Sequence, residues 1–493
     1  MLYFWHMQKK IYLLFVVFCI SLSIKAQEKW DLKKCVDYAW QNNINVKQQE
    51  LQLGLSAVSQ LQAKNAVYPN ANFSNNTCLQ FGRSVDPTTN QFTTTQLLFQ
   101  SYSLNADVMI YNWNRVKNSL IAAKTDLKAA QANVEKAKND IALSVATAFL
   151  QALLNREQIG VAEVQFQQTK SQLEATRKRV NAGSLPELNA VELEAQLARD
   201  STSIITAKGT ASLSLLQLKS LMNLDAATPF DIDVPPVDKI PIDPIADLQP
   251  ENVFQLAIKN QPTQKVNQLR LQASQTNVKI AKAAMYPSIS AFVGLGTNFA
   301  NPFKKITGVS FNGYGSPDPT LGAVNVGGTD YFIQQPKVTV TQSQKSFGQL
   351  WQGYGNQLEQ NFRQNFGIAI NVPIFSNGGS ARTQFERSKL NVKIAALNIQ
   401  QADQQLKQDI YQAYTNAFSA LQRYNSTIAT VNASQKTFDF AKKRYDVGLL
   451  GTFELITNQN NLNTAKQNKL LAQYEYVFRM KVLEFYKGQG LKL

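Results

Sequence analysis

Four stretches of the chain alternate apolar and polar residues with a period of two. In each stretch one face is apolar, and the other is polar and often rich in asparagine. The apolar positions are Ala71, Phe73, Thr77, Leu79 and Phe81; Leu98, Tyr102, Leu104, Ala106, Val108 and Ile110; Ile289, Ala291, Val293, Leu295 and Phe299; and Phe362, Phe366, Ile368, Ile370, Val372 and Ile374. A period of two over about ten residues predicts transmembrane β-strands with lipid on one side and water on the other. A half-buried soluble sheet has the same alternation, but its inner face would need a core to pack against.

Two long stretches repeat with a period of seven. Their apolar positions are Leu120, Leu127, Val134, Ile141 and Ala148 in the first, and Phe385, Val392, Ile399, Leu406 and Ala413 in the second, where Asp403 interrupts the row. This spacing, with alanine at many seam positions, predicts coiled-coil helices that approach closely. No proline occurs from Asn114 to Asn181. We therefore predict one helix of about 68 residues and roughly 100 Å there, and a similar helix from Ser376 to Asp446.

The chain contains an internal duplication. Residues 39–69 recur 218 positions later without a gap. The residues that reappear are Ala39, Asn42, Lys47, Leu51, Leu53, Ser56, Ala63, Lys64, Ala66, Tyr68 and Pro69. The match resumes at a spacing of 265, where Arg179 and Gly183 pair with Arg444 and Gly448. The second copy must therefore hold an insertion of about 47 residues, and the fold must be pseudo-symmetric.

The duplication predicts the organisation of the chain. We expect a first repeat over residues 27–224 and a second over 251–493, each with a helix, two strands and a long helical hairpin. Residues 225–250 hold six of the sixteen prolines and are expected to form an extended linker. The insertion is expected in segment 301–360, which is rich in Gly, Asn, Ser and Pro, either as a long external loop or as a plug folded inward. Residues 1–26 predict a cleaved signal peptide, with an uncleaved membrane anchor as the alternative.

Four strands are too few to close a membrane barrel, which needs about eight. An open sheet edge in lipid would leave unpaired backbone groups, each of which costs several kcal/mol. We therefore expect other copies of the chain to complete the barrel. Three copies would supply twelve strands, and rotational symmetry would place a pore on the axis.

Candidate catalytic groups are scarce. The single histidine, His6, lies in the predicted signal peptide, so the mature chain would have no imidazole for acid–base catalysis or metal binding. Cys35 and Cys78 lack metal-ligand spacing and are expected to be buried thiols, with a disulfide as the alternative. Gly294 and Gly296 lie in a predicted strand and form no phosphate-binding loop. We therefore expect no enzyme, no cofactor and no metal ion.

The formal net charge is +16, with 50 lysines and arginines against 34 acidic residues. A basic balance also occurs in nucleic-acid-binding proteins. Here, however, the basic residues are scattered along the predicted helices and are not clustered with aromatic residues. We therefore expect solvated helix faces, in contact with anionic lipid or cell-wall material, and no nucleic-acid partner.

Four segments carry a family resemblance. The most specific is Lys443–Thr457 (KRYDVGLLGTFELIT), and Arg179–Asn189 (RVNAGSLPELN) is its weaker first copy. A third segment, Val372–Phe375 followed by Asn377–Arg382, is similar to the family's strand-to-helix junction. The fourth, the GRSVDP loop that begins at Gly82, is similar to the loop of family members from Bacteroidetes. The whole mature chain resembles the TolC family of bacterial outer-membrane efflux channels, which has the same duplicated order of elements.

The resemblance implies a fold and a site. The fold is mainly α with membrane β: a homotrimer with a twelve-stranded barrel in the outer membrane and an α-helical tunnel across the periplasm. Two glycines would lie at helix-hairpin turns, where a positive φ is needed. These turns would form a periplasmic tip that closes the channel and meets the adaptor protein. The candidate tip residues are Gly183, Asn189, Tyr445, Gly448, Leu450, Glu454 and Thr457.

The tip departs from the family pattern. In the best-known members of the family, a tyrosine and an arginine bond to an aspartate of the neighbouring hairpin, and acidic residues ring the aperture. Tyr445 matches the tyrosine, but Leu450 stands in place of the arginine and Asn189 in place of the aspartate. Thr457 replaces one acidic residue. Glu454 either forms a ring of three carboxylates that favours cations or is an exposed residue that the helix dipole stabilises.

These features predict a passive exit duct of a tripartite efflux or type I secretion system. A periplasmic adaptor and an inner-membrane transporter would open it, and outer-membrane lipid would surround its barrel. One alternative is a periplasmic adaptor-like coiled-coil protein, which would need a lipoyl-like β-domain and an anchor. Another is a surface structural protein or adhesin. The exported substrate and the class of transporter leave no mark in the sequence.

Overall fold

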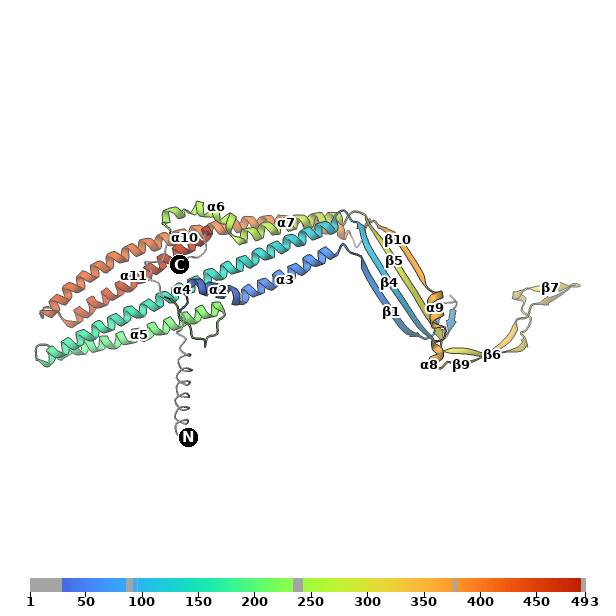
Figure 1. Cartoon of the computed structure of the whole chain (residues 1–493), viewed down its shortest axis with the longest axis horizontal. Coiled ribbons are helices and arrows are strands. Elements are labelled where there is room, and N and C mark those ends of the chain that lie inside the picture. The colour runs from blue at the N-terminus through green and yellow to red at the C-terminus, as the bar shows by residue number, and fades with distance from the viewer. Residues whose placement is uncertain (1–28, 86–91, 95, 234–242, 376–378, 489–493) are drawn as a thin grey trace, which may run out of the picture. The chain divides into compact units, whose positions relative to one another are not determined.

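The computed structural model (Figure 1) describes residues 29–85, 92–94, 96–233, 243–375 and 379–488. The predicted signal peptide lies outside these residues. The chain forms two compact units, which we call the helical unit (residues 1–61, 121–278 and 387–493) and the sheet unit (residues 62–120 and 279–386). Along the described residues, no helix combines the length and the apolar character needed to cross a membrane.

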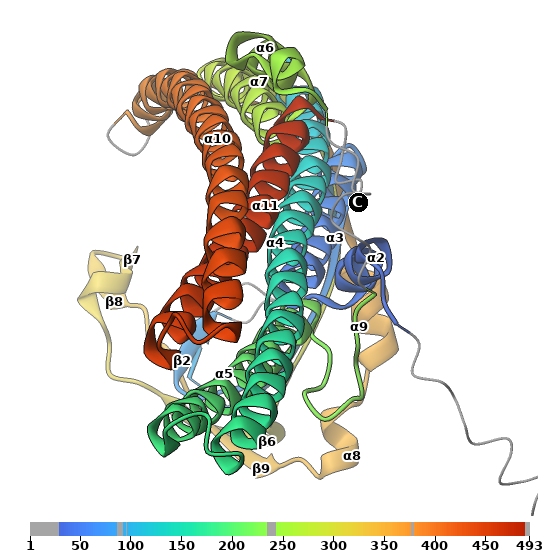
Figure 2. The ribbon, with the colours of Figure 1, turned by 90° about the vertical axis from the view of Figure 1, so that its left-hand side faces the viewer.

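The main helices confirm the internal duplication, because they form four pairs of equal length. The pairs are α2 (Leu32–Asn42) and α6 (Pro250–Asn260) with 11 residues, α3 (Ile44–Asn65) and α7 (Pro262–Ala283) with 22, α4 (Arg115–Asn181) and α10 (Ser380–Asp446) with 67, and α5 (Glu187–Met222) and α11 (Thr452–Lys487) with 36. The two long helices predicted from the heptad pattern are confirmed. Each is followed by its return helix (Figure 2), so the helical unit contains two antiparallel hairpins.

Small and aliphatic side chains hold the helical unit together. Ala146, Phe149 and Leu153 of α4 are buried in one cluster with Cys35 of α2. Ile232, which follows α5, belongs to the same cluster, and its backbone pairs with that of residue 30. Alanine lets the helix backbones approach closely, and burial of the larger side chains supplies the free energy. A second cluster joins α10 and α11 to α6 and to the short 3-10 helix η2 (Ile245–Leu248).

The sheet unit contains the four predicted strands in one antiparallel sheet. They are β1 (Asn70–Gln80), β4 (Leu97–Tyr111), β5 (Ser288–Pro302) and β10 (Arg363–Asn371), in the order β1-β4-β5-β10. Strands from the two repeats meet in the middle, at the β4–β5 pair. Each repeat therefore contributes one edge strand, and within the described chain neither β1 nor β10 has a partner on its outer side.

The strand register sorts the side chains onto two faces. We call one the apolar face; it carries Ala71, Phe73, Leu104, Ala106, Val108, Ile289, Ala291, Val293, Leu295, Phe366, Ile368 and Ile370. The other, the polar face, carries Asn72, Ser74, Ser103, Asn105, Asp107 and Asn365. Nothing in the described chain covers most of the apolar face, and Phe366 is 84% exposed. This face has no protein core against it, so the half-buried soluble sheet is not what the chain forms.

The segment predicted as a loop after β5 contains regular structure. β6 (Lys304–Tyr314) and β9 (Pro336–Gln344) form a two-stranded ribbon, and β7 (Ala323–Val326) pairs with β8 (Thr329–Phe332) between them. Two short helices follow, α8 (Phe347–Leu350) and α9 (Tyr354–Gln360). The shorter loop of the first repeat holds a small pair, β2 (Arg83–Val85) and β3 (Phe92–Thr94).

The two short helices lie against the apolar face of the sheet. Thr297 Oγ1 donates a hydrogen bond of 2.6 Å to the Leu358 carbonyl, and Asn301 Nδ2 donates one of 2.8 Å to the Leu350 carbonyl. Thr297 and Asn301 are two and six residues beyond Leu295 on β5, so their side chains lie on the same, apolar face. α8 and α9 thus lie on the apolar face, whereas a plug inside the barrel would cover the polar face.

Candidate functional site at the ends of the helix hairpins

The two hairpin turns have the same backbone geometry. Gly183 and Gly448 end α4 and α10 with φ values of 74° and 80°. The N–H of each following residue, Ser184 and Leu449, donates to a carbonyl five residues earlier, at 2.9 and 2.8 Å. This is the Schellman pattern, in which glycine adopts the left-handed conformation at little cost. The structure thus places both predicted glycines at helix-hairpin turns of the helical unit.

Tyr445 is the most buried of the predicted tip residues. Its side chain is 7% exposed, and its hydroxyl lies 2.8 Å from Oγ1 of Thr176 on α4. The Arg179 guanidinium lies 5.9 Å from the centre of its ring. The hydroxyl pair joins the first hairpin to the second. Thr176, which the sequence did not single out, is therefore the partner of this tyrosine within the chain.

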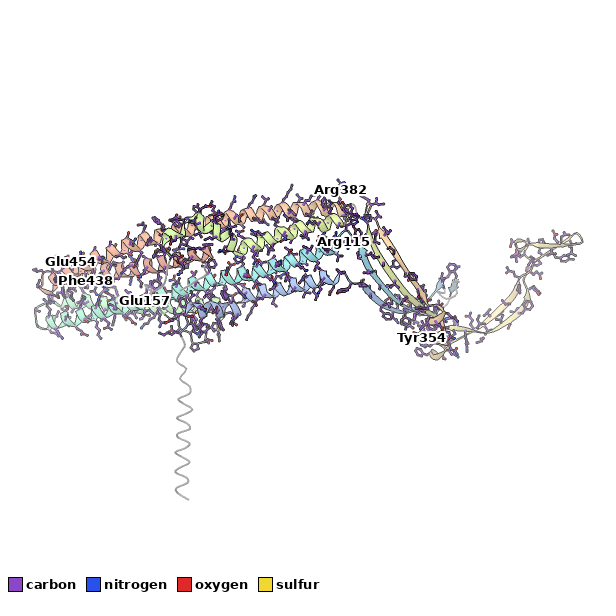
Figure 3. The ribbon with its side chains drawn as sticks, turned by 45° about the horizontal axis from the view of Figure 1, so that its top comes forward. Arg115, Glu157, Tyr354, Arg382, Phe438 and Glu454 are labelled. Carbon is purple, nitrogen blue, oxygen red and sulfur yellow. The ribbon has the colours of Figure 1, made fainter. Side chains whose placement is uncertain are left out.

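Leu450 takes part in an apolar cluster rather than in a polar latch. It packs with Phe438, Ala441 and Tyr445 of α10 and with Leu455 of α11. Figure 3 shows Phe438 near the turn that leads into α11. The residue that stands in place of the family's arginine thus closes the end of the second hairpin by burying apolar surface.

The remaining predicted tip residues, Asn189, Glu454 and Thr457, lie in the first turns of α5 and α11. Asn189 is half-buried in the first turn of α5. Glu454 is exposed in the first turn of α11 (Figure 3). Thr457 is exposed as well, and its Oγ1 donates to the Phe453 carbonyl at 2.8 Å. In the described chain, no hydrogen bond or ion pair links the side chains of Asn189 or Glu454 to Tyr445. The charged latch of the family therefore has no counterpart within one chain.

A buried polar cluster, which the sequence did not single out, joins the two hairpins. Asp200 of α5 is 5% exposed and accepts hydrogen bonds from Thr169 Oγ1 at 2.6 Å and from Gln196 Nε2 at 2.8 Å. Gln459 of α11 donates to Thr169 Oγ1 at 3.2 Å. Asn463 of α11 also joins the two hairpins, because its side-chain amide donates to Oε1 of Gln165 on α4. We call these residues, with Gln165 and Asn460, the polar seam.

The residues of the polar seam follow a spacing that is visible in the sequence and that could have predicted part of the seam. Gln165 and Thr169, Gln196 and Asp200, and Gln459 and Asn463 are three pairs of polar residues at a spacing of four. Such pairs share one helix face, and here that face is a packing seam. Their mutual contact joins residues up to 298 positions apart, so spacing alone does not reveal it.

An arginine ties the first hairpin turn together. Arg177 Nη1 donates to Glu187 Oε1 at 2.7 Å, and its Nε donates to Glu194 Oε1 at 3.1 Å. The hydrogen bond and charge of Glu194, followed by the charge and hydrogen bond of Glu187, raise the pKa of the Arg177 guanidinium. These groups are exposed, so they fix the turn geometry more than they stabilise the fold.

A groove of about 920 Å³ runs along the hairpins. Its apolar lining comes from α4, α5, α10 and α11 and includes Val164, Phe166, Ile204, Phe438 and Leu455. Charged residues of both signs line it as well: Glu163, Arg179, Lys208, Lys442 and Asp446. A long apolar groove with charged edges fits the side of an amphipathic helix. Among the described residues, no cluster of metal-ligating side chains is present.

Comparison with known proteins identifies the family. The sequence pattern of the outer membrane efflux protein family matches residues 36–224 and 334–488. The chain belongs to this family. As an outer membrane efflux protein, it is an outer-membrane channel that extends into the periplasm. The predicted resemblance is confirmed, and the interpretations as an adaptor or an adhesin are set aside. No curated protein sequence matches the chain significantly.

Solved structures share the fold of this outer membrane efflux protein. CusC superimposes with a TM-score of 0.69 and 16% sequence identity, covering 95% of this chain and 96% of its own. VceC from Vibrio cholerae gives 0.69 and 15%, covering 94% and 97%. The open state of the MtrE outer membrane channel from Neisseria gonorrhoeae gives 0.66 and 18%, covering 94% and 89%. The predicted fold class, mainly α with four β-strands and an internal duplication, is confirmed.

Proposed function

We propose that the protein is the passive exit duct of a tripartite efflux or type I secretion system and works as a homotrimer. The observation that carries this proposal is the four-stranded sheet, which has two unpaired edges, an exposed apolar face and a polar face. Three copies that pair β1 with β10 of the next copy give a closed twelve-stranded barrel with lipid outside and water inside. The long hairpins continue the duct into the periplasm.

The hairpin ends form the gate of this duct. The hydroxyl pair of Thr176 and Tyr445 and the polar seam hold the second hairpin against the first, which favours a closed tip. A periplasmic adaptor, driven by an inner-membrane transporter, opens the tip by separating the hairpins. The groove lined by Phe166 and Phe438 receives a helix of the adaptor. Three copies of the exposed Glu454 line the aperture and favour cations.

Conductance and gel migration test the proposal together. The purified protein should migrate as a heat-sensitive trimer and should form pores in planar bilayers. Thr176→Val and Tyr445→Phe each remove one hydroxyl of the buried pair, at a cost of about 1 kcal/mol per subunit. That cost corresponds to an increase of about fivefold in the open-to-closed ratio of each subunit, seen as higher mean conductance of the trimer.

The matched control is Thr430→Val. Thr430 lies on α10, where its hydroxyl donates only to the Ser426 carbonyl of its own helix. Its replacement should leave conductance unchanged. A preparation that forms neither trimers nor pores contradicts the exit duct. Pores whose conductance is unchanged in both hydroxyl variants contradict the gate alone.

A further inference from the structure

An aromatic cluster covers the loop end of the sheet on its apolar face. Phe299 of β5 is 0% exposed because Trp351 stacks on it at 5.8 Å and Tyr354 packs edge-on at 5.0 Å. The Tyr354 hydroxyl lies 2.8 Å from that of Tyr102 on β4. Figure 3 shows Tyr354 at the end of the strands opposite to Arg115, which begins α4. We call this cluster the aromatic cap.

Two lysines lie next to the aromatic cap, where the β6–β9 ribbon leaves the sheet. The Phe303 N–H donates to the Gln96 carbonyl, and the Lys345 N–H donates to the Phe303 carbonyl, both at 2.8 Å. The Lys345 ammonium donates to Oδ1 of Asn301, on the side covered by α8 and α9. Lys305 comes from the opposite strand of the ribbon.

These two ammonium groups lack an anion. Burial, followed by the nearby charge of Lys305, lowers the pKa of Lys345. No carboxylate of the described residues forms an ion pair with either lysine, although ion pairs occur elsewhere in the chain. Two like charges held close together at a partly buried site attract an anion that can contact both.

The position of the lysines along the strands indicates which anion. From Ile289 to Phe299 the apolar face of β5 rises about 34 Å along the strand, or roughly 25 Å across a membrane at the usual strand tilt. That is the height of the apolar band of an outer-membrane barrel. A second aromatic group, Tyr111, Trp113 and Tyr286, lies at the other end with ring centres 5.4 and 4.8 Å apart.

We propose that Lys305 and Lys345, with the aromatic cap, bind the phosphate group of an anionic glycolipid in the outer leaflet of the membrane. The lysines stand just beyond the outer end of the apolar band, at the level of lipid phosphates. Trp351 and Tyr354 lie on the lipid side at the interface, where aromatic rings are favoured. The site belongs to the outer surface of the barrel and is separate from the duct and its gate.

Lipid binding to the intact trimer tests this site. The probe is diphosphoryl lipid A, added to the full-length trimer in neutral detergent and measured by native mass spectrometry. Lys305→Gln with Lys345→Gln should weaken binding about tenfold or more, since each lysine near a charged lipid surface contributes appreciably. Lipid A without phosphates should bind wild type and the double variant equally.

Two controls keep the test specific. Lys337→Gln removes a lysine farther along the same ribbon and should change binding by less than about twofold. Lys345→Arg keeps the charge and should retain binding. Both variants and the double variant should still form conducting trimers, which separates failure of this site from failure of the exit duct.

Three results would overturn the proposal. Equal binding by the wild type and the double variant shows that the lysines do not hold the lipid. Equal weakening by Lys337→Gln shows a diffuse effect of charge. Full competition by inorganic phosphate at millimolar concentration shows a site for free anions rather than for a lipid.

Discussion

At the scale of single residues, neutral groups contact Tyr445 at the end of the second hairpin. Tyr445 bonds to Thr176, and Leu450 packs into an apolar cluster instead of supplying a charge. A hydrogen bond between two buried hydroxyls contributes little net free energy, but breaking it leaves a polar atom without water. If these contacts close the tip as proposed, the closed state should depend less on salt than a tip closed by exposed ion pairs.

The two cysteines of the described chain should differ in reactivity. Burial, with a smaller effect of Asp31, raises the pKa of the Cys35 thiol to about 12, so almost no thiolate exists at pH 8. Cys78 is half-buried on the polar face of β1. A charged maleimide at pH 8 should label Cys78 and spare Cys35 in the folded trimer, and should label both in detergent at high temperature.

Labelling also reports on the orientation of the sheet. If only a lipid-soluble maleimide reaches Cys78, the polar face does not line water and the assignment of the two faces is wrong. The Cys78→Ser variant should show no labelling in the folded state. Both thiols are free in the structure, so the alternative of a disulfide between Cys35 and Cys78 is wrong.

At the scale of elements, the two repeats have identical helix lengths but unequal ends. The hairpins of 67 and 36 residues end in the same glycine turn. Next to the turn of the second hairpin, Tyr445 and Leu450 pack in an apolar cluster. Next to the turn of the first hairpin, Arg177 instead bonds to Glu187 and Glu194. The two hairpins therefore agree in length and turn geometry but differ in the side chains at their ends.

Alanine at the turn glycines should destabilise the hairpins. Gly448 has a φ of 80°, and a side chain there costs roughly 1–2 kcal/mol. Gly160 lies inside α4 with open space around it, so Gly160→Ala should instead stabilise by about 0.5–1 kcal/mol. Thermal unfolding of the trimer, followed by circular dichroism at 222 nm, should move in opposite directions for Gly448→Ala and Gly160→Ala. A shift of the same sign in both variants contradicts the assigned turn.

The polar seam should couple the hairpins. Asp200→Leu removes the carboxylate and leaves the Thr169 hydroxyl and one Gln196 N–H without their acceptor, at a cost of about 1–3 kcal/mol for each buried group. The variant should unfold at lower temperature and conduct more. Asp140→Asn is the matched control, because Asp140 is an exposed partner of Lys136 and should change stability by less than about 1 kcal/mol. A normal unfolding temperature and conductance in Asp200→Leu would show that the seam does not hold the tip.

At the scale of the whole molecule, the sheet has no stable existence as a monomer in lipid. Its two edges are unpaired within the described chain, and its apolar face is uncovered along most of its length. Both deficits are relieved by the same event, closure of three sheets into one barrel inside a membrane. Assembly and insertion are therefore expected to be coupled.

Neighbouring residues on opposite faces of β10 should respond differently to the same charge. Phe366→Lys places an ammonium on the lipid side and should cost about 2–4 kcal/mol near the midplane. Asn365→Lys places it on the water side and should be tolerated. The measurement is the yield of heat-sensitive trimer after refolding into phospholipid vesicles. Equal yields for the two variants contradict the barrel orientation.

Much of the fold could be predicted because its elements are long and regular. Over ten or more residues a period of two or seven fixes both the type of element and the side that it buries. The ribbon and helices within segment 301–360 could not be predicted, because its Gly- and Pro-rich composition hides short elements. At the site, the glycines of the turns were predictable from their local motif, whereas the partner of Tyr445 lies 269 positions away.

The sequence by itself determined the strands, the long helices, the duplication and the family, since each depends on local periodicity or on motifs. Only the tertiary structure decided that Thr176 pairs with Tyr445, that three polar pairs meet in one seam, and that α8 and α9 lie on the apolar face. The physical reason is that such contacts depend on how distant helices and strands pack. A residue's own neighbours in the chain do not encode that packing.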